Sequence, residues 1–100
     1  MKTNEMAQRI AQVTGKTMDE TLRLAGEINT LIECMREGRM TFRFEKADGT
    51  IRTAYGTLKS DLVGEVKGTG RKPNPDLVTY WDLAKESWRS FSIFRFKEVA

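Results

Sequence analysis

Arginine and aromatic side chains are interleaved in the second half of this 100-residue chain, and these residue types suit ligand recognition. The expected binding residues are Arg43, Arg52, Arg89, Arg95, Phe91 and Tyr80, together with the basic pair Arg71 and Lys72. Aromatic faces stack nucleic-acid bases, and the planar guanidinium group of arginine suits phosphates. The pattern predicts a surface that binds nucleic acid or a nucleotide-like ligand. The alternative is an aromatic core surrounded by a solvated arginine face.

Arg89 and Arg95 give this hypothesis its most specific form. They fall on one face of a predicted extended run, with Phe91 between them. If that strand is unbent, we expect the two arginines to hold phosphates of one strand while an aromatic ring stacks a base between them.

Side chains for nucleophilic or metal chemistry are scarce. The chain has no histidine and one cysteine, Cys34, which excludes a disulfide, a Cys–His pair and a Cys/His zinc site within one chain. The glycines at 64–70 lack the phosphate-binding loop pattern, and the aspartates lack the spacing of a calcium loop. We therefore expect a protein that is not an enzyme and uses no metal or cofactor.

The net charge of +3 is unevenly distributed. Residues 1–38 hold five Lys/Arg against six Asp/Glu, whereas residues 39–100 hold twelve against eight. The basic half is compatible with nucleic acid and equally with an ordinary solubility charge. No apolar run of about 18 residues and no signal-peptide pattern occurs, so we expect a cytoplasmic protein that does not enter a membrane.

Helical periodicity is confined to the first 38 residues. The spacing of apolar side chains predicts a short helix over Asn4–Val13 that ends at Gly15. Thr17 and Glu20 then have the spacing of a capping box, which predicts a long helix over Met18–Glu37.

The long helix carries an apolar stripe that is too wide for the first helix alone to cover. Its members include Leu24, Ile28, Leu31 and Met35. We expect this stripe to pack against the strands or to form a homodimer, and the pattern does not choose between them.

Strand signals begin at Met40. Apolar and polar residues alternate over residues 40–46, Asp48-Gly49 supplies a hairpin turn, and residues 50–58 form the return strand, with Gly56 suited to a bulge or bend. Residues 59–76 lose this periodicity and predict a long loop, which is a candidate ligand arm or a plain connection.

The end of the chain predicts a second hairpin, with strands over Val78–Leu83 and Trp88–Val99. Aromatic residues occur on both faces of the second run, which a strand buried on one side would not need. We therefore expect a bulge or bend near Phe94 that turns the corner of a barrel.

This hairpin resembles the closing hairpin of WYL-type domains, whose pattern is roughly Arg-x-Phe-Arg-Leu-Asp-Arg-Ile. The matching residues are Arg89, Phe91, Ile93, Arg95 and Phe96, whereas Ser92 and Phe94 replace an arginine and an aspartate. Residues 40–99 resemble short WYL-like, Sm-like barrel proteins of unknown function from bacterial and mobile-element genomes. Larger WYL proteins are thought to sense nucleotides or nucleic acid through paired arginines, so the resemblance implies a ligand face at Arg89 and Arg95.

The first two helices resemble, in spacing, the helical hairpin that opens histone-like HU proteins, although the DNA-binding arm of those proteins has no counterpart. Together these patterns predict an α+β fold, with a helical hairpin at 1–38 and a small, strongly bent antiparallel Sm/SH3-type β-barrel at 39–100. We expect a non-enzymatic regulatory module that binds nucleic acid or a nucleotide. The alternative is a protein-interaction or assembly module that uses the stripe on the long helix.

Overall fold

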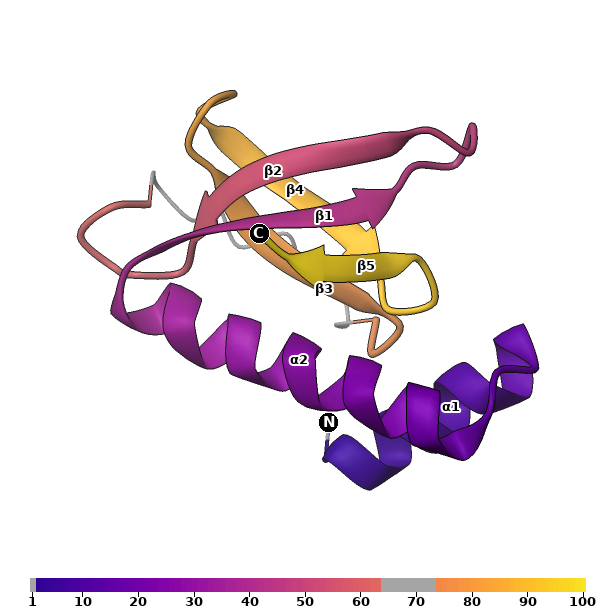
Figure 1. Ribbon diagram of the computed structural model, residues 1–100. Coiled ribbons are helices and arrows are strands. Elements are labelled where there is room, and N and C mark those ends of the chain that lie inside the picture. Colours follow the sequence, from indigo (N-terminus) through magenta and orange to yellow (C-terminus); the bar gives the residue numbers. More distant parts are fainter. Residues whose placement is uncertain (1, 64–73) are drawn as a thin grey trace.

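The computed structural model describes residues 2–63 and 74–100. Two helices precede five strands: α1 (Thr3–Thr14), α2 (Met18–Glu37), β1 (Arg39–Glu45), β2 (Ile51–Thr57), β3 (Leu77–Asp82), β4 (Ser87–Ser92) and β5 (Phe96–Val99). The helix α2 runs beneath the curled sheet, and α1 packs against α2 (Figure 1). The predicted α+β class and element order are confirmed.

Both helices form where the sequence predicts them. The side chain of Thr17 accepts a hydrogen bond from the backbone N–H of Glu20 at 3.3 Å, so the cap begins α2 as expected. The short helix α1 is one residue longer at each end than predicted and ends at Gly15, whose φ of +74° lies in the left-handed region that glycine adopts readily.

The apolar stripe of α2 is buried within one chain. Ile28, Leu31 and Met35 have no exposed surface, and Leu24 is also buried. These side chains are covered by α1 and by the inner face of the curled sheet. The extent of that sheet face could not be read from the sequence pattern. These four side chains offer almost no exposed surface for the predicted dimer interface, because α1 and the strands of the same chain already cover them. The helices α1 and α2, which resemble the opening hairpin of HU proteins, thus pack against the strands of the same chain.

One apolar core joins the helices to the strands. It contains side chains from α1, α2 and all five strands. The predicted boundary at residue 38 therefore marks a change of secondary structure within one core.

The five strands form one antiparallel sheet in the order β4-β3-β2-β1-β5. The β1–β2 turn is tightened by Gly49, which donates its N–H to the carbonyl of Lys46 at 2.9 Å. Only Gly49 in this turn has a positive φ, of +89°, so the turn is a longer one than the predicted two-residue turn over Asp48-Gly49.

The predicted bend near Phe94 is confirmed, and it is sharp enough to divide the expected strand over Trp88–Val99 into β4 and β5. The side-chain oxygen of Ser92 accepts from the N–H of Phe94 at 3.2 Å, and the carbonyl of Ser92 accepts from the N–H of Arg95 at 3.0 Å. After this turn β5 pairs with β1. Arg89 and Arg95 therefore lie on different segments, and the spacing expected for an unbent strand does not apply to them.

Candidate functional site

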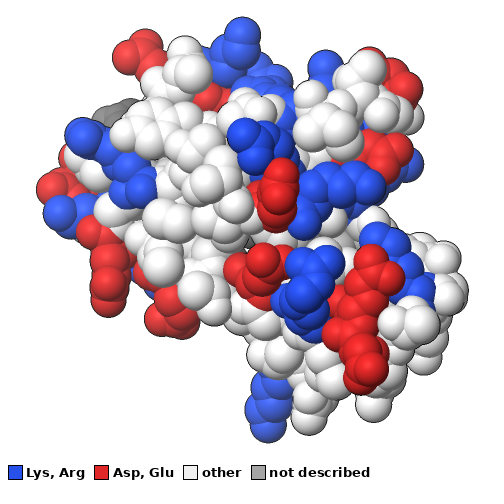
Figure 2. Space-filling model, in the orientation of Figure 1, with Lys and Arg blue, Asp and Glu red and all other residues white. Residues whose placement is uncertain are grey.

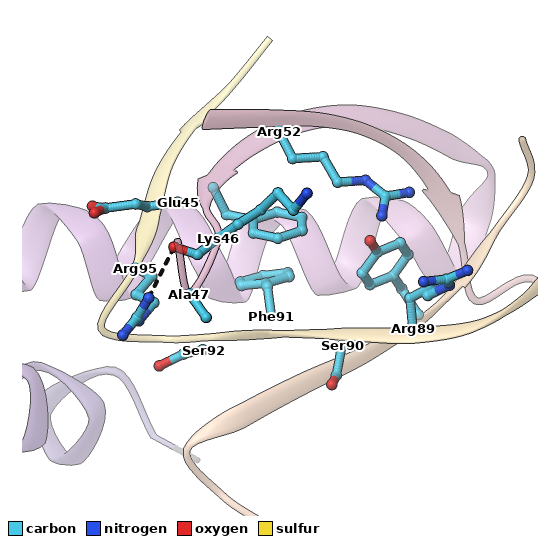
Figure 3. A pocket seen from close by; sticks show the side chains of 11 residues that line it. Glu45, Lys46, Ala47, Arg52, Arg89, Ser90, Phe91, Ser92 and Arg95 are labelled. Carbon is cyan, nitrogen blue, oxygen red and sulfur yellow. Dashed lines mark hydrogen bonds between the residues drawn. The ribbon is translucent and has the colours of Figure 1, made fainter. Parts of the chain in front are cut away.

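A pocket of about 350 Å³ lies between the β1–β2 hairpin and β4 (Figure 3). Four basic side chains line it, namely Lys46, Arg52, Arg89 and Arg95. Three buried aromatic side chains, Phe44, Tyr80 and Phe91, also line it. The pocket thus combines a basic rim with an apolar floor.

Strand alternation and register bring these groups together. In β2, Arg52 has the same orientation as the buried Ala54, at the end of the strand where the core gives way to solvent. Tyr80 in β3 lies directly opposite Arg89 in β4, and Phe91 follows two residues later on the same face. The inner face of the sheet therefore carries both the core rings and the basic groups at its edge.

Arg95 reaches the pocket from the turn between β4 and β5. Its guanidinium group donates to the backbone carbonyl of Lys46 at 2.9 Å, and its own carbonyl accepts from the N–H of Glu45 at 2.8 Å. These two hydrogen bonds join the β4–β5 turn to the β1–β2 hairpin, so both segments that form one end of the pocket are held together (Figure 3).

A buried ion pair fixes Arg52. Its guanidinium group donates to Asp82, whose side chain has no exposed surface. The other carboxylate oxygen of Asp82 accepts from the backbone N–H groups of Ala84 and Lys85 at 2.9 and 3.0 Å. Asp82 therefore holds the β3–β4 turn and also forms an ion pair with Arg52. A buried carboxylate requires such a positively charged partner, because an unpaired buried charge is destabilising.

The other three basic groups form no ion pair with a carboxylate in the described residues. Arg89 donates to the hydroxyl of Ser87 at 3.2 Å. The acidic residue in the lining, Glu45, pairs instead with Lys97 at 3.5 Å. The pocket consequently carries an excess of positive charge.

This local excess matters because charge is mixed on the face shown in Figure 2. Basic and acidic side chains lie interspersed there among uncharged ones. A net charge of +3 therefore does not produce one continuous basic face there. Recognition of an anion is better served by the pocket, where apolar walls strengthen the interaction of charges.

The Tyr80 side chain has no exposed surface, and its buried hydroxyl has no hydrogen-bond partner among the described residues. Burial raises the pKa of Tyr80; the positive charges of Arg52 and Arg89 oppose this shift and Asp82 reinforces it. The hydroxyl is therefore protonated near neutral pH and is a hydrogen-bond donor.

The structure brings together five of the eight predicted binding residues: Arg52, Arg89, Arg95, Phe91 and Tyr80. Arg43 lies elsewhere, in an exposed ion pair with Glu98 at 3.0 Å, because it faces away from the core in β1. The predicted ligand arm, with Arg71 and Lys72, lies mainly outside the described residues.

The predicted stacking role of the aromatic rings is wrong for Phe91 and Tyr80. Phe91 is 2% exposed and stacks on Phe44 with ring centroids 5.4 Å apart, so its face is already covered. The sequence reasoning also missed Lys46. Lys46 lies beside the β1–β2 turn and follows a strand with one face toward the core, and this position could have indicated that it belongs to the site.

Other site types find no support among residues 2–63 and 74–100. No group of three or more His, Cys, Asp or Glu side chains there could hold a metal ion. Within the same residues, neither helix has the length and apolar character needed to cross a bilayer.

A curated protein to which this chain is similar is described as uncharacterised. It is the 11.5 kDa protein of the Gp31-cd intergenic region of Enterobacteria phage T4, 40% identical over 55 residues, which cover 50% of this chain and 54% of the phage protein. The chain thus spans about half the length of that relative. No solved structure matches. The WYL_2 family model, described as an Sm-like SH3 β-barrel fold, matches residues 28–97, which run from the middle of α2 into β5, and the chain therefore belongs to the WYL_2 family.

Proposed function

We propose that this protein binds nucleic acid or a nucleotide-like ligand through the pocket, as a small non-enzymatic regulatory module of the cytoplasm. One observation carries the proposal: Lys46, Arg89 and Arg95 converge on a single pocket and form no ion pair with a carboxylate in the described part of the chain. Uncompensated basic groups around a concave site favour an anionic ligand.

The chemistry of the lining favours phosphate as that anion. Arginine presents a planar set of donors that matches phosphate oxygens, and two of the free basic groups are arginines. The apolar floor lowers the local dielectric, which strengthens the attraction between these charges and a phosphate. A volume of about 350 Å³ falls in the range of roughly 300–1,000 Å³ that is usual for small-ligand sites.

The test is fluorescence anisotropy with a dye-labelled single-stranded oligonucleotide and, in competition, free nucleotides, at several salt concentrations. Neither tryptophan lines the pocket, so a labelled ligand is a more direct probe than tryptophan quenching. The variant carries Arg89→Ala and Arg95→Ala. It should bind more weakly, and the slope of log affinity against log salt should become shallower by about 1.4, which is roughly 0.7 for each of two lost phosphate contacts.

A second double variant, Arg36→Ala with Arg43→Ala, removes the same charge from exposed positions outside the pocket. It should retain most of the affinity. The control variant should melt close to the wild type, because exposed charges contribute little to stability. The pocket variant also loses the hydrogen bond from Arg95 to the Lys46 carbonyl and should be less stable by about 0.5–1.5 kcal/mol, which leaves it folded in the binding assay. Equal loss of binding in the two variants would mean that only net charge matters, and unchanged binding by the pocket variant would remove the proposal.

A further inference from the structure

The hydroxyl of Tyr80 is a buried donor with no partner in the described residues, and its side chain lines the pocket. Buried polar groups are almost always hydrogen-bonded, since an unpaired one is destabilising. Tyr80 lies opposite Arg89 across the β3–β4 pair, and the charges of Arg52 and Arg89 both act on it. Of the two unpaired buried polar groups in the described residues, the Tyr80 hydroxyl and Trp88 Nε1, the Tyr80 hydroxyl belongs to a residue that lines the pocket with the basic groups.

We propose that Tyr80 donates a hydrogen bond to a terminal phosphate group of the bound ligand, which Arg89, Arg95 and Lys46 surround. The inference rests on the proposed function and deepens it. It makes the terminal phosphomonoester, such as the 5′-phosphate of a nucleotide or of a strand end, the preferred ligand group, and it makes Tyr80 the residue that distinguishes this group from a backbone phosphodiester.

Charge balance favours the monoester. Lys46, Arg89 and Arg95 supply three positive charges that form no ion pair with a carboxylate in the described residues, whereas Arg52 is paired with Asp82. Of these three, Lys46 also acts electrostatically on Asp48 in the same turn. A phosphomonoester carries a charge of about −1.5 to −2 at neutral pH and offers three terminal acceptor oxygens. A diester carries one negative charge, so the monoester compensates more of the charge in the pocket.

The number of acceptor oxygens also favours the monoester. Three acceptor oxygens allow one to accept from Tyr80 while the others accept from basic groups on different sides of the pocket. Figure 3 shows Arg52 and Arg89 on one side of the Phe91 ring and Arg95 on the other, with Lys46 between them. The raised pKa of Tyr80 keeps its hydroxyl protonated, and a protonated hydroxyl can donate to a phosphate oxygen.

Pocket size limits how much of a polymer can enter. A volume of about 350 Å³ lies at the lower end of the roughly 300–1,000 Å³ usual for small-molecule sites. It accommodates one phosphate with part of its nucleoside.

The experiment measures binding by calorimetry of a tetrathymidylate with a 5′-phosphate and of the same oligonucleotide with a 5′-hydroxyl. The wild type should bind the 5′-phosphate form at least about 10-fold more tightly. The Tyr80→Phe variant should lose about 10- to 100-fold in affinity for that form, as expected for a hydrogen bond to a charged group, and should bind the 5′-hydroxyl form almost as the wild type does.

Melting temperature separates this role from a structural one. Tyr80→Phe should melt at or above the wild-type temperature, because it removes a buried hydroxyl that lacks a partner. Tyr55→Phe is the matched control, since Tyr55 is exposed and outside the pocket, and it should change neither measurement.

Three results would overturn the inference. Equal binding of both oligonucleotides by the wild type would remove the terminal-phosphate preference while leaving the proposed function intact. A Tyr80→Phe variant that keeps the 5′-phosphate preference would remove the role of the hydroxyl. Binding of neither oligonucleotide would remove the inference, and the absence of binding by free nucleotides as well would remove the proposed function.

Discussion

Replacing Gly56 with alanine should destabilise the protein by about 1–3 kcal/mol, the usual cost of overpacking a core. A β-carbon on Gly56 would lie 2.6 Å from Cδ2 of Tyr80 and 3.3 Å from Cε1 of Phe42. Carbon atoms pack best about 3.5–4.0 Å apart, so the tyrosine ring would have to move by roughly 1 Å. That ring is fully buried and packs edge-to-face on Phe42 with centroids 5.0 Å apart, which leaves it little room.

Urea denaturation followed by circular dichroism measures this loss, and Gly26→Ala supplies the control. A β-carbon on Gly26, inside α2, meets no atom within 4 Å. Alanine there should stabilise the protein by about 0.5–1 kcal/mol through helix propensity. The expected change in unfolding free energy therefore has opposite signs at the two sites. A Gly56→Ala variant as stable as the wild type would refute the close contact between Gly56 and the Tyr80 ring.

The buried ion pair should be far more important for stability than an exposed one. Arg52→Ala leaves the buried carboxylate of Asp82 unpaired and should cost about 3–5 kcal/mol, whereas Arg43→Ala should cost less than about 1 kcal/mol; equal unfolding free energies would contradict this ranking. Gly49→Val forces a branched residue into a φ of +89° and should cost more than about 1 kcal/mol, whereas Asp48→Asn keeps the acceptor oxygen of the turn and should be close to neutral at pH 7. Hydrogen bonds from Thr50 lower the pKa of the Asp48 carboxyl group from its ordinary value of 3.8. Its ionised form therefore contributes stability above pH 3.8, and this stability is lost as the pH falls through the lowered folded-state pKa. Melting temperatures measured over an acid pH series should fall less in Asp48→Asn than in the wild type.

The elements of this fold could be predicted from local patterns. The capping pair at Thr17 and Glu20 gives the start of α2, and alternation around Phe42 gives β1. Aromatic residues on both faces of the final run indicated the bend at Phe94. Each of these signals lies within a few residues of the feature that it predicts.

The composition of the site depends on contacts that no local pattern contains. Arg52 and Asp82 are 30 residues apart in sequence, so only the pairing of β2 with β3 shows that this arginine is neutralised while Arg89 is not. The burial of a side chain also cannot be read from its residue type. Phenylalanine is a residue type that can stack on a base, yet Phe91 lies beneath the surface of the barrel.

The pairing of β5 with β1 links occupation of the pocket to folding of the chain. Phe96 in β5 lies opposite Phe44 and packs on Phe91 with ring centroids 5.7 Å apart, so the last strand supports two rings of the pocket floor. Strands so far apart in sequence pair late, because closing a long loop is entropically costly. During synthesis the pocket cannot be complete until β5 has left the ribosome. A ligand present at 100 times its Kd would then favour the closed barrel by about 2.7 kcal/mol, so ligand binding would also stabilise the pairing of β5 with β1.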